Sequence, residues 1–143
     1  MQFLAISLGG AVGALLRYYI TQFSNNIAVK IIDRNTILSV TSPHESSNMI
    51  FPWGTLIVNL VGSFLIGVLF VLIIEKSQWS ETMRLFLIVG FLGAFTTFSS
   101  FSIDNFQLLA QGEIIKAIVN IVLNVSLGLL LVWLGIILSR NFL

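Results

Sequence analysis

The sequence has no cysteine, only one histidine and few charged side chains. Without cysteine, the chain cannot form disulfide bonds or thiolate metal sites, and it cannot use a cysteine nucleophile. The single histidine, His44, lies in a polar stretch, so a histidine-rich metal site and a Ser/His/Asp triad are excluded. The sequence therefore offers no catalytic constellation, and an enzyme is the least expected class of protein.

Charge is scarce as well. Only 9% of the 143 residues are charged and 57% are hydrophobic, whereas a soluble domain carries roughly a quarter of charged residues. The net charge of +1 provides no basic face for a nucleic acid. A soluble fold of this length has too little interior to bury so much apolar surface, so lipid is the expected solvent.

Four apolar segments are each long enough to cross a hydrocarbon core, which takes roughly 20 helical residues. They run from about residue 1 to 23, from 54 to 74, from 85 to 110 and from 114 to 138. Residues 24–52 read as an extended polar loop. The predicted fold is therefore a single all-α membrane domain over residues 1–143 with four transmembrane helices.

The basic side chains are balanced across the expected membrane. With Arg17 set aside as intramembrane, one side carries Lys76, Arg84 and Arg140 and the other carries Lys30, Arg34 and Lys116. The positive-inside rule therefore favours neither orientation in the membrane. This balance predicts that the chain inserts in both orientations and forms an antiparallel dual-topology dimer. A weak bias hidden in a small count is the alternative.

The third apolar segment contains the most informative stretch, residues 90–102. Two glycines and five hydroxyl side chains are crowded there among four phenylalanines. Gly90 and Gly93 favour a break in the helix, which would free backbone carbonyls that must find a donor or a cation. Broken helices of this kind form ion sites in other membrane proteins.

The phenylalanines of this stretch are spaced for a helical face. Phe98 and Phe101 are three apart, and Phe91 and Phe95 continue the same face if the backbone is helical. Such a stripe is usually core packing. An aromatic ring also has a positive edge, so ring edges beside hydroxyl donors could contact a small anion.

The second and fourth spans contain three asparagines. Asn59 is in the second span, and Asn120 and Asn124 share one face of the fourth, with Ser126 off that face. Interhelical hydrogen bonding would account for each amide singly. Taken together with the third span, the three amides favour a track of donors along a polar pathway.

The first span carries a charge and a small-residue pattern. Arg17 faces either a polar cavity or, by snorkelling, the headgroups. Gly9 and Gly13 form a small-xxx-small motif that permits close helix packing.

These residues closely resemble the CrcB/Fluc family of fluoride channels over all four spans. The stretches that carry the resemblance are residues 9–18, 54–62 and 90–101, with a weaker match at Asn120, Asn124 and Gly128. The resemblance implies a homodimer of antiparallel subunits in the inner (plasma) membrane, with two fluoride pores that are each built from both subunits. It implies passive export of fluoride that entered the cell as HF. Some family members work instead as paired, non-identical subunits.

The resemblance also implies roles for individual residues. The fluoride pore would contain Phe98, Phe101, Asn59, Asn124, Thr97 and Ser99. Arg17 would lie in the vestibule. The backbone carbonyls of Gly93 and Thr96 would hold a structural Na⁺ at the dimer interface.

Two other classes remain open on the residues alone. A proton-coupled exporter of organic cations would need a carboxylate in an early span, where the sequence offers only Arg17. A non-transporting structural membrane protein would explain the glycines and phenylalanines as packing, but it leaves the inward amides and the broken helix unexplained.

Overall fold

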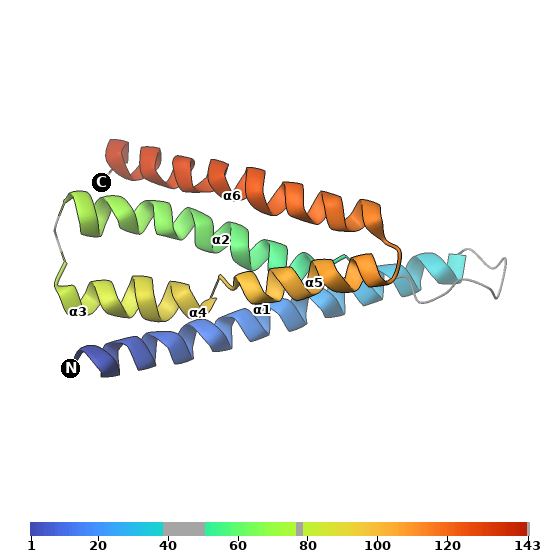
Figure 1. Cartoon of the computed structure of the whole chain (residues 1–143), viewed down its shortest axis with the longest axis horizontal. Helices are drawn as coiled ribbons and strands as arrows, with labels where there is room; N and C mark the ends of the chain where they lie inside the picture. The colour runs from blue at the N-terminus through green and yellow to red at the C-terminus, as the bar shows by residue number, and fades with distance from the viewer. Residues whose placement is uncertain (39–50, 77–78, 143) are drawn as a thin grey trace.

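The structure, a computed structural model, describes residues 1–38, 51–76 and 79–142, and within these ranges every regular element is helical. The elements are α1 (Gln2–Leu38), α2 (Trp53–Leu69), η1 (Phe70–Glu75), α3 (Glu81–Arg84), η2 (Leu85–Leu92), α4 (Gly93–Phe95), α5 (Phe98–Ala110) and α6 (Ile114–Phe142). The elements η1 and η2 are π-helical. η1 continues α2, and η2 joins α3 to α4, so the elements combine into longer helical rods (Figure 1).

Four of these rods are long and apolar enough to cross a membrane. They cover Gln2–Ile31, Trp53–Ile73, Glu81–Ala110 and Ile114–Phe142. The two termini lie at the same end of the bundle as α3, and the turn between α5 and α6 lies toward the other end (Figure 1). The prediction of an all-α fold with four membrane-spanning helices is therefore confirmed.

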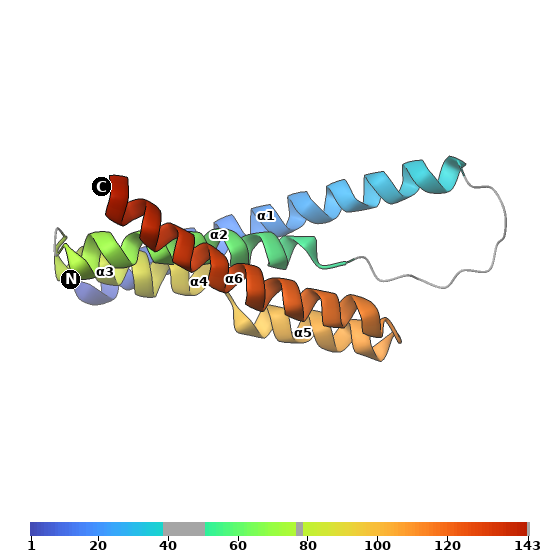
Figure 2. The ribbon, with the colours of Figure 1, turned by 90° about the horizontal axis from the view of Figure 1, so that it is seen from above.

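The first helix is longer than the sequence suggested. α1 continues to Leu38 and has 37 residues, so the prediction of a loop that begins at Ser24 is wrong. Residues 24–38 contain neither glycine nor proline, and polar side chains alone do not end a helix. At 1.5 Å per residue α1 is about 55 Å long, and its C-terminal part extends beyond the other helices (Figure 2). The rest of the predicted loop, residues 39–50, lies outside the described residues.

Glycines allow α1 and the first half of the third span to pack backbone to backbone. A Cβ at Gly90 would lie 2.6 Å from the carbonyl oxygen of Ile6, and one at Gly13 would lie 2.9 Å from the Phe95 nitrogen. A Cβ at Gly9 would meet the Phe91 nitrogen at 2.9 Å. Real Cβ atoms do not approach backbone this closely, so only glycine fits. The predicted close packing through Gly9 and Gly13 is confirmed.

A small core joins three of the rods. Val58, Leu92 and Phe95 are buried at its centre. Partly buried side chains packed around them are Ile20, Leu65, Ile66, Leu69 and Phe91. Most other large apolar side chains are exposed on the single chain, which suits a protein whose outer surface contacts lipid.

The third span is broken, as predicted, but not at its glycines. α4 ends at Phe95, α5 begins at Phe98, and Thr97 between them is extended with φ −101° and ψ 123°. Gly90 and Gly93 lie within helical turns, so the prediction that they mark the break is wrong. Gly90 serves the close contact with α1, and the break falls at Thr96 and Thr97. There the chain changes course before α5 runs beside α6 (Figure 2).

Candidate functional site

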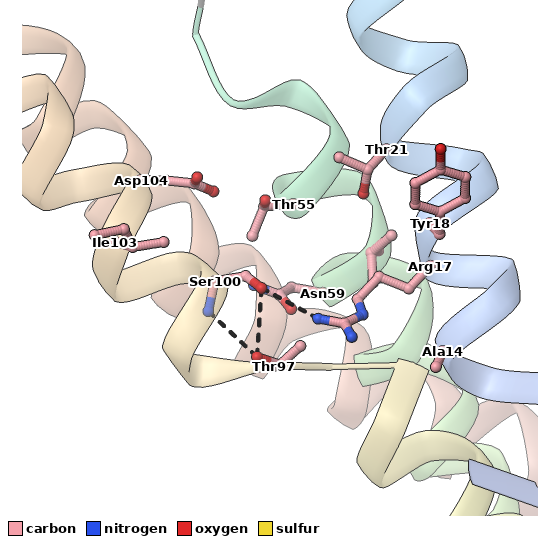
Figure 3. A pocket seen from close by; sticks show the side chains of 11 residues that line it. Ala14, Arg17, Tyr18, Thr21, Thr55, Asn59, Thr97, Ser100, Ile103 and Asp104 are labelled. Carbon is pink, nitrogen blue, oxygen red and sulfur yellow. Dashed lines mark hydrogen bonds between the residues drawn. The ribbon is translucent and has the colours of Figure 1, made fainter. Parts of the chain in front are cut away.

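A cleft of about 340 Å³ lies beside the break, between α1, α2 and α5. Five hydroxyl side chains line it, those of Tyr18, Thr21, Thr55, Thr97 and Ser100. Arg17, Asn59 and Asp104 also line it (Figure 3). The cleft therefore brings donors and charges from three helices to the point where the third span is interrupted.

Thr97 organises the first turn of α5. Its hydroxyl oxygen accepts a hydrogen bond from the backbone N–H of Ser100 at 3.2 Å, as an N-cap residue does. The Thr97 and Ser99 hydroxyls also lie 2.7 Å apart. A threonine at the break thus satisfies one of the backbone donors that a new helix start leaves free.

Arg17 faces this cleft. It is partly buried, and its Nη1 donates to the hydroxyl of Ser100 at 3.2 Å (Figure 3). The sequence left open whether the Arg17 side chain faces a polar cavity or the headgroups, and the structure favours the cavity. The bond ties α1 to the first turn of α5, on the far side of the break from the glycine contact.

Asp104 occupies another part of the cleft wall. Thr55 of α2 lines the same part of the cleft (Figure 3). The carboxyl oxygen Oδ2 of Asp104 is buried without a hydrogen-bond partner among the described residues. A guanidinium and a carboxyl group therefore line the same cleft (Figure 3).

Four asparagines form a continuous chain of hydrogen bonds across α2, α6 and α5. Asn59 Nδ2 donates to Asn124 Oδ1 at 2.8 Å, and Asn124 Nδ2 donates to Asn120 Oδ1 at 2.9 Å. Asn120 Nδ2 then donates to Asn105 Oδ1 at 3.2 Å. Finally, Asn105 Nδ2 donates to the Phe101 carbonyl at 2.6 Å. The prediction that Asn120 and Asn124 share a face is confirmed.

The phenylalanines divide into two pairs on either side of the break. The rings of Phe91 and Phe95 are stacked with their centroids 5.6 Å apart, and Phe95 is buried in the core. The rings of Phe98 and Phe101 lie 5.7 Å apart, and Phe98 is 79% exposed. Phe91 and Phe95 therefore pack in the core, whereas Phe98 of the other pair is exposed on the single chain.

A second, smaller groove lies on a different face. It has a volume of about 190 Å³ and is lined by α2 and the first half of the third span. Gly62, Ser63, Gly93 and Thr96 contribute to it. The Thr96 hydroxyl donates to the Leu92 carbonyl at 3.1 Å. This groove is open on the single chain.

The predicted site residues thus fall into three groups. Arg17, Asn59 and Thr97 meet in the cleft, and Asn124 joins them through Asn59. Ser99 contacts Thr97. Gly93 and Thr96 lie together in the second groove, and Phe98 and Phe101 form their own pair.

Sequence reasoning assigned no site role to several residues of this region, among them Ser100, Asp104 and Asn105. An amide within an apolar span needs a partner, and the same criterion that selected Asn59 would have selected Asn105. Ser100 and Asp104 follow the break and lie four residues apart, at helical spacing, but only the rotation of α5 shows that they face α1 and α2.

The fold and the cleft define a four-span membrane protein with polar side chains gathered at a broken helix. Residues 4–136 match the family model described as CrcB-like protein, Camphor Resistance (CrcB). The chain therefore belongs to the CrcB family of multi-pass membrane proteins.

Curated relatives cover nearly the whole chain. The fluoride-specific ion channel FluC of Hydrogenovibrio crunogenus is 43% identical over 142 residues, which are 99% of this chain and 93% of the relative. The protein of the same name from Rhizobium leguminosarum bv. trifolii is 40% identical over 140 residues, with 98% and 97% covered. That from Hahella chejuensis is 38% identical over 135 residues, with 94% and 91% covered.

Proposed function

We propose that this chain is a fluoride-selective channel that lets fluoride leave the cell passively across the plasma membrane. The observation that carries the proposal is the meeting of Asn59, Thr97 and Arg17 in one cleft at the break of the third span. Membership in the CrcB family and the names of the curated relatives support the choice of fluoride.

The chemistry of the cleft suits a small anion. Fluoride is small and holds its water tightly, so a pore must replace its hydration shell with strong donors. Asn59 offers an amide, Thr97 and Ser99 offer hydroxyls, and Arg17 adds positive charge at the opening. The positive ring edges of Phe98 and Phe101 then complete a narrow, dry passage that larger anions fit poorly.

The working unit in this proposal is an antiparallel dimer of two copies of this chain. Phe98 is 79% exposed on the single chain although it lies beside a polar cleft, which supports a partner that covers it. The second groove, with Gly93 at its surface, offers a place for close helix contact between copies. The balanced basic side chains support insertion of the two copies in opposite orientations.

A structural Na⁺ at the centre of that dimer is part of the proposal. A helix leaves its last four carbonyls without partners inside the helix, and Gly93 and Thr96 supply carbonyls of this kind where α4 ends. Backbone oxygens of an unwound helix are suitable ligands for Na⁺. The residues present therefore fit the ion, which would hold the two broken helices together by charge.

Growth in fluoride tests this function in cells. Bacteria that lack their own fluoride exporter and express this chain should grow at fluoride concentrations that stop the same cells with an empty vector, because a passive channel returns internal fluoride to the external level. The control is an equally expressed Phe101→Ala variant, which should not protect. Protection by neither protein, with both present in the membrane, would contradict the proposal and favour a structural role.

A further inference from the structure

The asparagine chain, which comprises Asn59, Asn124, Asn120 and Asn105, has a direction. A side-chain amide has two N–H donors and one carbonyl oxygen. The oxygens of Asn124, Asn120 and Asn105 each accept a bond from the preceding member. Each of these amides is thereby held in one orientation by its neighbours.

The two ends of the chain differ. Asn124 directs its Nδ2 at both oxygens of Asn120, the side-chain and the backbone one, each at 2.9 Å. Asn59 uses its Nδ2 for one bond within the chain, so a second N–H remains at the end that lines the cleft. At the other end, the chain stops at the carbonyl of Phe101. It therefore joins the donor in the cleft to the helical turn that carries Phe98 and Phe101.

Burial makes the middle of this chain more than a set of local helix bonds. Asn120 is 0% exposed and Asn105 is 7% exposed, so water does not replace a lost partner. By contrast, the exposed Ser126 makes a similar bond to the carbonyl of Val122, four residues earlier, at 2.6 Å. Loss of one partner from a buried network costs more than loss of an exposed bond.

We propose that Asn105 is a positioning residue of the pore. Held by Asn120, it fixes the first turn of α5 through the Phe101 carbonyl and so sets the ring of Phe101 relative to Asn59. This inference rests on the proposed fluoride channel and adds to it a residue that does not itself contact the ion. Selectivity should then depend on a side chain that lies behind the pore.

Three variants test this role. Asn105→Ala removes the whole contact. Asn105→Ser keeps a hydroxyl that can donate to the carbonyl four residues earlier, as Ser126 does in α6, but loses the link to Asn120. Ser126→Ala removes a bond of the same geometry outside the chain and is the matched control. Each variant is purified as the full chain, checked for its oligomeric state by size-exclusion chromatography and reconstituted.

The measurements are fluoride efflux from liposomes and the reversal potential in planar bilayers with fluoride on one side and chloride on the other. We expect Asn105→Ala to lower fluoride efflux about tenfold, the scale of one lost buried hydrogen bond, and to move the reversal potential toward lower fluoride selectivity. Asn105→Ser should recover most of the reversal potential, and Ser126→Ala should match the wild type.

An Asn105→Ala protein with wild-type efflux and reversal potential would overturn the proposal. So would Asn105→Ser with the same loss as Asn105→Ala, because the bond to Phe101 would then not be what matters. If Asn105→Ala does not fold, Asn105→Leu, which has a similar volume but no donor for the Phe101 carbonyl, must show the same loss of selectivity, or the proposal fails. A wild-type protein that does not conduct fluoride would contradict the proposed function itself, and the positioning role with it.

Discussion

At the scale of single residues, Thr97 explains how a helix can be interrupted inside a membrane. Lipid offers no hydrogen bonds to free backbone groups. The Thr97 hydroxyl accepts the bond from the Ser100 N–H, and Arg17 bonds to the Ser100 hydroxyl. The break is therefore stabilised by side chains that also line the cleft, so the same residues serve the fold and the proposed pathway.

The two phenylalanines after the break give the first prediction at this scale. Phe98→Ala and Phe101→Ala should each reduce fluoride efflux from liposomes to background, because the passage loses its ring edges and its dry walls. Phe98 is 79% exposed on the single chain, so its removal leaves no cavity within the subunit. The subunit should therefore keep its fold, and because the proposed dimer also forms contacts at the groove that contains Gly93, the dimer should persist on size-exclusion chromatography.

Phe106→Ala is the control for this pair. Phe106 is 66% exposed on the same helix and lies outside the cleft, so its variant should keep wild-type efflux. Unchanged efflux in a well-folded Phe98→Ala or Phe101→Ala protein would count against the pore assignment.

Some residues of the site could be predicted from the sequence, and others could not. Asn59, Asn120 and Arg17 could be identified because a polar side chain in an apolar span needs a partner. Which partner each one meets depends on the rotation and spacing of the helices, which a single sequence does not contain. Ser100 and Asp104 could therefore not be assigned to the cleft, and the link from Asn120 to Asn105 joins helices through side chains 15 positions apart.

At the scale of elements, the third span divides into two parts with different neighbours. Its first half packs on α1 through glycines, and α5 packs on α6. The sequence showed that this span is broken, but glycine was the wrong marker, because Gly90 is needed for close approach and not for a bend. Residues 24–38 were wrongly predicted as part of a loop because many of them are polar. They contain no glycine or proline, so nothing prevents a helix there.

Paired glycines in α1 test the packing of the first half. Gly9→Ala should destabilise the protein by about 1–3 kcal/mol, as overpacking does, because the new Cβ meets the backbone of η2. Gly10→Ala is the matched neighbour. The nearest atom to its Cβ would be the Gly90 oxygen at 3.9 Å, an ordinary contact.

Thermal unfolding in detergent measures both variants. We expect a lower Tm for Gly9→Ala and an unchanged or slightly higher Tm for Gly10→Ala, since alanine favours helix over glycine. Equal melting temperatures for the two variants would show that α1 and η2 do not pack as described.

At the scale of the whole molecule, the part of the chain that the structure describes has four helices that can span a membrane, and polar side chains line a cleft and a groove between them. The cleft beside the break and the groove that contains Gly93 are both exposed on the single subunit.

An exposed ion pair lies at the end of the bundle near the C-terminus. Arg140 of α6 donates through Nε to Glu75 at the end of η1 at 3.0 Å. That hydrogen bond holds the pKa of the Glu75 carboxyl below its usual value. The pair is exposed and contributes little to stability.

The proposed dimer gives both the cleft and the groove a role. Two antiparallel copies would cover the exposed Phe98 and bring the two broken helices together at Gly93 and Thr96. The balanced basic side chains make both orientations available in one membrane. A pathway built from two copies would also explain why the cleft and the groove are not closed within a single subunit.

Fluoride efflux from liposomes that contain the purified protein is the most direct test of the proposed fluoride channel. A fluoride electrode follows the release, and a matched experiment with chloride-loaded liposomes measures selectivity. We expect fast fluoride release with negligible chloride release, because the donors and rings beside the break suit the smaller anion. Correctly folded dimers that release no fluoride, or that release chloride as readily, would contradict the proposed function.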